Sequence, residues 1–203
     1  MENSVTSASP VRLILPKRHG DTRGWFTETY NRNAFVALGI ECVFVQDNHS
    51  LSAPAFTLRG LHFQTPPRAQ DKLVRCIRGR IFDVAVDLRK TSPTYGQWVG
   101  AELSADNGHQ LFVPVGFAHG FLTLEADCEV VYKCSDTYAP AQDGGIAWND
   151  PALTGVGSLT SGIAWPLPAG VTPELSGKDK VQPLLSEFDS LFAYDGRPLT
   201  PLA

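Results

Sequence analysis

The sequence predicts an all-β protein made of many short antiparallel strands. Gly and Pro number 18 and 15 among 203 residues, which suits frequent turns and is too many for a helical bundle. Several segments alternate apolar and polar residues with period two, and strands do not alternate regularly with helices as in a parallel sheet. About eight to ten strands of this kind leave a sandwich, a jelly roll or a barrel as the architecture. Ligands bind in the mouths of small barrels, so inward polar residues are candidate functional groups.

The composition predicts a folded protein of one domain that spans residues 1–203. Hydrophobic residues make up 43% and charged residues 19%, close to globular averages. We find no internal repeat or linker, and expect an N-terminal arm before the jelly roll or barrel and an irregular segment with a short helix after it. A net charge of -4 gives no basic field for phosphate backbones, so nucleic acid is not an expected partner.

The cysteines and the apolar runs predict a cytoplasmic protein without a membrane partner. The 4 cysteines form no CxxC pair and are too few for a disulfide-rich scaffold, so we expect reduced thiols. The N-terminus contains no signal-peptide core, since Arg12 interrupts its only apolar patch. No run approaches the roughly 18 apolar residues of a membrane span.

The first part of the chain predicts a strand, a turn with a second strand, and one helix. Val11 to Leu15 is strand-like and ends at Pro16. Asp21 to Tyr30 opens with turn residues and continues into aromatic and β-branched residues. Asn33 to Leu38, closed by Gly39, predicts the only helix of the first half.

Strands follow one another from Val43 to Tyr138. Phe82 to Arg89 alternates strictly, and Arg78-Gly79-Arg80 is short enough to join it to Lys72 to Ile77 as a hairpin. In Cys128 to Ser135, Tyr132 falls on the same face as Cys128, Val130 and Cys134, so its ring is expected to point inward. Near the end, Leu184 to Phe192 predicts a short helix.

Three chemically capable side chains lie close together in the sequence. His62 is either a half-buried, hydrogen-bonded histidine or a general base, because its ordinary pKa lies near working pH. Lys72 is either a surface charge or an ammonium group that points into a cavity. Arg59 suits either an ion pair or a phosphate clamp.

A second cluster has the pattern Pro-x-Gly-x-x-His, from Pro114 to His119. This spacing resembles the second conserved box of the cupin superfamily, whose metal-binding members take one ligand from it and the others from a His-x-His and a glutamate. The matching first box is His62-Phe63-Gln64, which lacks the second histidine. Two scattered histidines do not make a tight divalent site, so we expect no catalytic metal and interpret His119 as a polar contact inside the cavity.

Longer motifs make the resemblance specific. In order they are Phe44 to Ser50, Leu58 to Gln64, Lys72 to Cys76, Pro114 to Phe121, Tyr132-Lys133 and Leu175 to Asp179. Together they resemble the dTDP-4-dehydrorhamnose 3,5-epimerase family, from about Val11 to Asp195. The resemblance implies a cupin-type jelly-roll barrel with a few short helices. It also implies a homodimer and a cofactor-independent isomerase that epimerises C3 and C5 of dTDP-4-dehydro-6-deoxy-D-glucose, a step of dTDP-rhamnose biosynthesis.

The resemblance also implies a role for each catalytic residue. Removing the hydrogen on C3 or C5 gives an enolate at the C4 ketone, which requires a base, a donor at the ketone oxygen and an acid on the opposite face. His62 matches the base, and Asp179 the carboxylate that orients its imidazole. Lys72 matches the enolate stabiliser and Tyr132 the acid, although by residue type alone a core aromatic with a satisfied hydroxyl is the preferred interpretation of Tyr132.

The nucleotide-binding residues are likewise implied. Arg59 matches a phosphate contact and Tyr138 an aromatic beside the sugar and base, and the rest of the set is Arg23, Phe26, Glu28, Gln46 and Asn48. The stretch from Asp21 to Glu28 resembles the part of the family that reaches the partner's active site, although a turn into a strand explains it as well.

Two features remain open, and so do three alternatives. Arg59 and His62 face opposite sides of an ideal strand, unless Gly60 marks a bulge. The loop from Leu153 to Ile163 is longer than the family's usual connection, and its role is undetermined. The alternatives are an epimerase of C3 or C5 only, a non-catalytic cupin that binds a nucleotide sugar, and a metal-dependent cupin.

Overall fold

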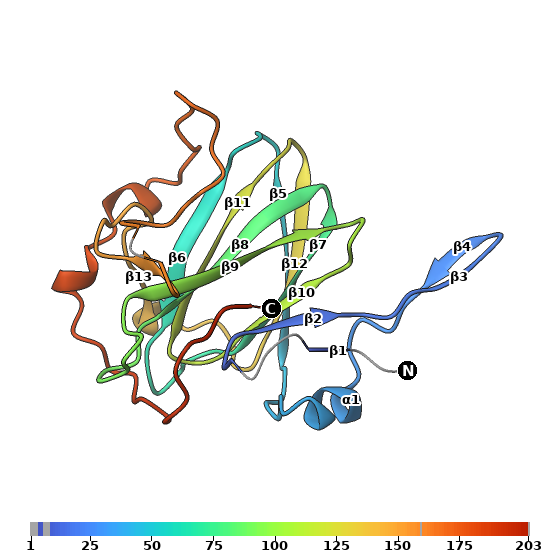
Figure 1. Cartoon of the computed structure of the whole chain (residues 1–203), viewed down its shortest axis with the longest axis horizontal. Coiled ribbons are helices and arrows are strands. Elements are labelled where there is room, and N and C mark those ends of the chain that lie inside the picture. The colour runs from blue at the N-terminus through green and yellow to red at the C-terminus, as the bar shows by residue number, and fades with distance from the viewer. Residues whose placement is uncertain (1–3, 6–8, 159, 203) are drawn as a thin grey trace.

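Two six-stranded sheets face each other in the computed structural model, which describes residues 4–5, 9–158 and 160–202 (Figure 1). In spatial order the first sheet consists of β1 (Ser4–Val5), β2 (Arg12–Leu15), β10 (Gln110–Val113), β7 (Lys72–Arg78), β12 (Cys128–Cys134) and β5 (Gln46–Ser52). The second consists of β13 (Asp143–Gly145), β6 (Leu58–Gln64), β11 (Phe117–Thr123), β8 (Arg80–Asp87), β9 (Gln97–Ser104) and β14 (Thr154–Gly155). Except for β14 beside β9, neighbouring strands in these sheets are antiparallel. The predicted all-β jelly-roll fold is confirmed.

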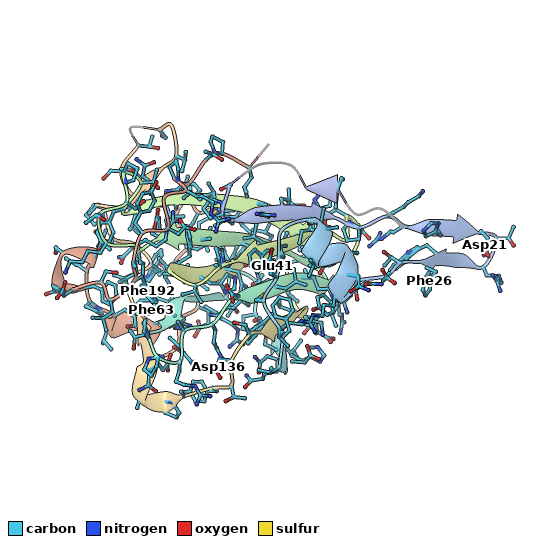
Figure 2. All side chains as sticks on the ribbon, turned by 90° about the horizontal axis from the view of Figure 1, so that it is seen from below. Asp21, Phe26, Glu41, Phe63, Asp136 and Phe192 are labelled. Carbon is cyan, nitrogen blue, oxygen red and sulfur yellow. The ribbon has the colours of Figure 1, made fainter. Side chains whose placement is uncertain are left out.

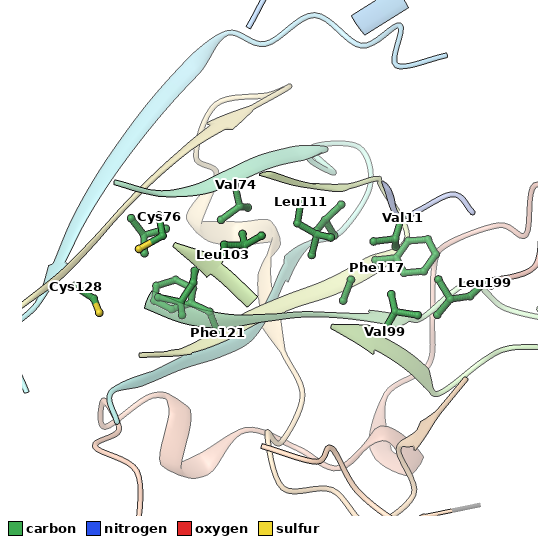
Figure 3. Packing of buried hydrophobic residues seen from close by; sticks show 14 residues of the cluster. Val11, Val74, Cys76, Val99, Leu103, Leu111, Phe117, Phe121, Cys128 and Leu199 are labelled. Carbon is green, nitrogen blue, oxygen red and sulfur yellow. The ribbon is translucent and has the colours of Figure 1, made fainter. Parts of the chain in front are cut away.

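The core lies between the two sheets, as Figure 3 shows. Val74 and Leu111 of the first sheet meet Leu103 and Phe121 of the second in one buried cluster. Burying each such side chain contributes about 1.5–3 kcal/mol, so this contact between the sheets holds the barrel closed. The site described below shares this interior, because Tyr132 packs against the same cluster.

The outer faces of both sheets are partly covered. Helix α1 (Arg32–Ala37), which Asn31 caps by accepting hydrogen bonds from Asn33 N and Ala34 N, buries Phe35 against Ile14 and Phe112 of the first sheet. On the second sheet, Val84 and Val86 of β8 point outward and are buried under the C-terminal part of the chain. The alternation predicted for Phe82 to Arg89 is therefore present, and its apolar face packs outside the barrel. Its other face turns Asp83 and Ala85 inward.

One hairpin extends away from the barrel. It consists of β3 (His19–Asp21) and β4 (Gly24–Phe26), joined by Thr22 and Arg23, and Figures 1 and 2 show it projecting from the body of the molecule. Trp25 is 58% exposed and Phe26 is 66% exposed. The predicted turn and strand are present, and an additional strand precedes the turn.

The hairpin predicted at Arg78-Gly79-Arg80 is wrong. β7 belongs to the first sheet, where it pairs with β10 and β12, whereas β8 pairs with β9 and β11 in the second. At Gly79 the chain passes from one sheet to the other with φ of +76°, and a Cβ there would lie 2.6 Å from Sγ of Cys128. Each strand hydrogen-bonds to partners in a different sheet, so a short connection does not make the two strands neighbours.

The helix predicted from Leu184 to Phe192 is also wrong. Only the 3₁₀ turn η3 (Leu185–Glu187) forms there. Within the described ranges the other 3₁₀ turns are η1 (Pro140–Gln142) and η2 (Asp179–Val181). The backbone follows the outer surface of the barrel instead. Leu185 N donates to Oδ2 of Asp150 over 2.6 Å, and the rings of Phe188 and Phe192 lie 4.8 and 5.7 Å from that of Phe63. Figure 2 shows Phe63 and Phe192 adjacent at this end.

The remaining elements agree with the sequence. The strand before Pro16 is β2, the first-half helix is α1, and Cys128 to Cys134 forms β12. Of the predicted arm, residues 1–3 and 6–8 lie outside the described part of the chain. No helix in the described ranges is long and apolar enough to cross a membrane.

Candidate active site

A bulge in β6 brings two functional side chains to the same side of the sheet. His119 of β11 pairs with His62, but Phe121 pairs with Arg59, so Gly60 and Leu61 together face Gly120 alone. Gly60 has φ of +132°, and a Cβ there would lie 2.6 Å from Cα of Gly120, so only glycine fits. The bulge predicted at Gly60 is confirmed, and it allows Arg59 and His62 to line one cavity.

That cavity, which we call the inner cavity, has a volume of about 220 Å³. The four predicted catalytic residues, His62, Lys72, Tyr132 and Asp179, all line it. They come from β6, β7, β12 and η2, so the site joins both sheets and the C-terminal segment. The other lining residues are Ser50, Arg59, His119, Phe121 and Ser176.

His62 forms a hydrogen-bonded pair with Asp179. Its Nε2 lies 2.5 Å from Oδ1 of Asp179, which is buried, whereas the imidazole is 31% exposed. The second carboxylate oxygen accepts a hydrogen bond from Oγ of Ser176 over 2.8 Å. Burial raises the pKa of Asp179, but the bonds to His62 and Ser176 and the nearby charges outweigh it, so the pKa lies below its ordinary value. Asp179 therefore stays ionised and holds the ring, which leaves Nδ1 of His62 for proton transfer.

Lys72 and Tyr132 are shifted in opposite senses by the same enclosed environment. Burial lowers the pKa of Lys72, and the groups Cys134, Asp83 and Asp143 oppose this by raising it. Burial raises the pKa of Tyr132, so its phenol stays protonated at neutral pH. The cavity thus brings the amine of Lys72 and the protonated phenol of Tyr132 together with an imidazole.

A wider outer cavity of about 380 Å³ shares His62, Lys72 and Tyr132 with the inner one. Gln46, Asn48 and Tyr138, all predicted to bind the nucleotide, line it. Tyr138 N donates to Oε1 of Gln46 over 2.9 Å, which fixes the backbone beside the 58% exposed Tyr138 ring.

Two charged residues of the outer cavity, Asp143 and Lys178, were missed by sequence reasoning. Nζ of Lys178 lies 2.5 Å from Oδ2 of Asp143, which also accepts a hydrogen bond from Oη of Tyr138 over 3.2 Å. Lys178 precedes Asp179 in the motif from Leu175 to Asp179, so the family resemblance that identified Asp179 could also have identified Lys178. Asp143 begins the short strand β13, an Asp-Gly-Gly segment that carries no signal of its own in the sequence.

The other predicted binding residues separate into two groups. Arg59 and His119 line the inner cavity. Arg23 and Phe26 lie on the projecting hairpin and line neither cavity of their own subunit, and neither does Glu28, which follows the hairpin. The loop beginning at Leu153 runs beside β9, where Gly155 and Val156 contribute to a separate groove. Leu159 of that loop lies outside the described residues.

The described histidines do not gather with other potential metal ligands. Within residues 4–5, 9–158 and 160–202, no group of three or more His, Cys, Asp or Glu side chains is arranged to hold a metal ion. His62 and His119 instead each contact a separate carboxylate, those of Asp179 and Asp83.

Comparison with known proteins identifies the family. A family model described as dTDP-4-dehydrorhamnose 3,5-epimerase matches residues 6–187. The chain belongs to this family. Two relatives named dTDP-4-dehydrorhamnose 3,5-epimerase are similar over most of their length. The one from Salmonella typhimurium is 52% identical over 185 residues, which cover 90% of this chain and 95% of that protein. The one from Sinorhizobium fredii is 50% identical over 188 residues, which cover 93% and 91%.

A solved structure supports both the fold and the family. It is the epimerase from Legionella pneumophila in complex with dTDP-4-keto-L-rhamnose, which is 41% identical to this chain. Its TM-score is 0.85, and the match covers 96% of this chain and 100% of that one. The resemblance drawn from the sequence motifs is confirmed.

Proposed function

We propose that this epimerase converts dTDP-4-dehydro-6-deoxy-D-glucose into dTDP-4-dehydro-L-rhamnose by inverting C3 and C5, a step in dTDP-rhamnose biosynthesis. The family and its relatives' names support the activity. The observation that carries the residue assignment is that His62, Lys72, Tyr132 and Asp179 line one cavity.

In the proposed reaction His62 is the base. Nδ1 takes the proton from C3 or C5, and the electron pair of the broken C–H bond forms the enolate with its charge on the C4 oxygen. The ammonium of Lys72 stabilises this oxygen, a role worth about 3–4 kcal/mol for one well-placed donor. Tyr132 then donates its phenolic proton to the opposite face of the same carbon, which inverts the centre. These steps require no cofactor or metal, because side chains supply the base, the donor and the acid.

The nucleotide part of the substrate fits the remaining groups. Arg59 lines the inner cavity, and a guanidinium suits a diphosphate oxygen. The half-exposed ring of Tyr138 provides a flat surface beside the outer cavity for thymine or sugar.

We also propose a homodimer in which the hairpin of one subunit completes the site of its partner. Arg23 and Phe26 have the chemistry for phosphate and base contacts, yet both are exposed on the hairpin, which projects from the barrel at Phe26 (Figure 2). A two-fold symmetric pair gives each site the hairpin of the other subunit. Residues 1–203 then form one domain, and the four cysteines, all described and all free thiols, are consistent with a cytoplasmic enzyme.

The first experiment follows proton exchange at both carbons. The purified, EDTA-treated chain is incubated with dTDP-4-dehydro-6-deoxy-D-glucose in D2O, and the C3 and C5 proton signals are recorded by NMR. We expect both signals to disappear and the L-rhamno product to form. Loss of one signal only would instead assign the chain to the single-carbon epimerases. Binding of the substrate without proton exchange would indicate a non-catalytic cupin. Exchange by the untreated protein that is absent after EDTA treatment would indicate a metal-dependent cupin.

Complementation tests the shared site. A hairpin variant, R23A/F26A, is expected to raise KM roughly 10- to 100-fold, because an aromatic stacked on a base contributes about 1–3 kcal/mol. Co-expressing it with His62→Asn gives heterodimers in which one site has both an intact base and an intact hairpin. Roughly one quarter of all sites are then complete, and activity at low substrate should exceed that of either homodimer. A co-expressed mixture no more active than the mean of the two homodimers would rule out the shared site.

A further inference from the structure

A second histidine–carboxylate pair lies at the inner cavity, and the proposed reaction leaves its carboxylate without a role. Asp83 of β8 points inward and is fully buried. Its Oδ1 lies 2.7 Å from Nε2 of His119, and both side chains are almost inaccessible. Its Oδ2 is buried and has no hydrogen-bond partner among the described residues. This carboxylate is therefore only half satisfied.

Such a group is costly for a barrel interior to keep. Moving an ionised carboxylate from water into the interior without full hydrogen bonding costs several kcal/mol of folding free energy. Replacing buried ionic groups with apolar residues of similar volume often leaves the stability of a protein unchanged or raises it. The neighbours of Asp83 on the same face of β8, Ile81 and Ala85, belong to the apolar core. An unpaired carboxylate oxygen does not strengthen this packing, so a role in the adjoining site accounts better for Asp83.

The first candidate role concerns the orientation of His119. A carboxylate only accepts hydrogen bonds, so Nε2 of His119 must carry the hydrogen that Asp83 receives. Nδ1 is then the nitrogen left for the cavity. His119 and His62 are directly paired residues of β11 and β6, so their rings start from neighbouring positions on the same face. Fixing the His119 ring therefore also limits the space beside the proposed base.

The second role concerns the charge of Lys72. Several groups from different elements act on this ammonium: Cys134 from β12, Asp83 from β8, Asp143 from β13 and Lys178 from the segment before η2. His62, Tyr132, Arg59 and Asp179 also line the same cavity. Asp83 and Asp143 are the two carboxylates that raise the pKa of Lys72 against burial. Of these two, Asp143 is already paired with Lys178, whereas Asp83 has a free carboxylate oxygen.

We propose that Asp83 is a positioning residue of the epimerase, which holds the imidazole of His119 in one orientation and supplies negative charge to the ammonium of Lys72. The proposal rests on the proposed function, since it assigns Lys72 to the enolate oxygen. Asp83 takes no proton from the substrate. It acts through His119 and Lys72, which both line the inner cavity.

The test compares pH profiles of Asp83→Asn with those of the parent chain. The amide keeps the shape of the side chain but removes the charge, so the pKa of Lys72 falls further. Lys72 is active when protonated, and the alkaline limb of kcat is therefore expected to move to lower pH, with kcat at neutral pH reduced roughly 10-fold or more. Asp150→Asn is the matched control, because Asp150 is equally buried but its oxygens bind Ala152 N and Leu185 N away from both cavities. It should lower Tm without moving the limb.

A double variant tests the contact with His119. If Asp83 acts through this ring, Asp83→Asn and His119→Asn together should cost less than the product of their separate effects on kcat/KM. An alkaline limb that stays in place, or effects that multiply fully, would overturn the proposal.

A measurement on the unaltered chain keeps the test independent of folding and of catalysis. Long-range ¹⁵N–¹H NMR should find a hydrogen on Nε2 of His119, and a ring that carries its hydrogen on Nδ1 alone would also overturn the proposal. If the parent chain exchanged neither C3 nor C5, the proposed function would fail, while this measurement would still report on the pair.

Discussion

Replacing His62 with Asn is expected to lower kcat by roughly 10²–10⁴-fold, the range contributed by a positioned general base. Asparagine retains a polar group that can bind Asp179, but it has no nitrogen that accepts a proton near neutral pH. Both C3 and C5 should stop exchanging with D2O, because the same base serves both carbons. The measurement is the NMR time course of both signals alongside kcat and KM. KM should change far less than kcat, since the base acts on the transition state.

The matched control is His49→Asn. This histidine is 55% exposed, and its Nε2 lies 2.9 Å from Glu129 on the outer face of the first sheet. Its replacement should leave kcat within about twofold, as expected of a surface substitution. A His62→Asn variant that retained more than a tenth of the parent kcat would contradict the assignment of His62 as the base.

The sequence could predict the strands that carry the site, but only part of how they assemble. The period of two in Cys128 to Cys134 was enough to predict that Tyr132 points inward, because side chains alternate strictly along a strand. A bulge at Gly60 could be predicted because Arg59 and His62 face opposite sides of an ideal strand, whereas their implied roles require both to reach one ligand. The same local logic failed at Gly79, where the chain changes sheets and a short connection does not imply pairing. It failed again after Leu184, where contacts with Phe63 and Asp150 outweigh helix propensity.

The long-range pairs of the site could not be derived from local pattern at all. His62 and Asp179 are 117 positions apart, and only the family resemblance brought them together before the fold was known. Asp83 was visible in a strictly alternating strand, yet nothing in its sequence neighbourhood pairs it with His119, 36 positions away. Which face of β8 points into the barrel depends on what covers the other face, here the C-terminal segment. That information is distributed over the whole chain.

Replacing Tyr132 with Phe is expected to separate proton removal from inversion. The variant keeps His62 and Lys72, so the enolate still forms and the proton returns from His62 to the face it left. C3 and C5 should therefore continue to take up deuterium, while formation of the L-rhamno product falls roughly 10²–10⁴-fold. Tyr138→Phe is the control, since its hydroxyl contacts Asp143 in the outer cavity. It should affect KM more than the ratio of exchange to inversion.

The pH dependence sharpens this prediction. Tyr132 is active as an acid when protonated, and because burial raises its pKa, it is not the group that limits activity as the pH rises. The pKa of Lys72 is lowered instead, so loss of its charge should set the alkaline limb in the parent chain. Deuterium exchange by the Tyr132→Phe variant should then retain the parent's alkaline limb. If the alkaline limb were absent from the Tyr132→Phe variant, the group that titrates there would be Tyr132 and not Lys72. If the variant still inverted both carbons at the parent rate, Tyr132 would not be the acid.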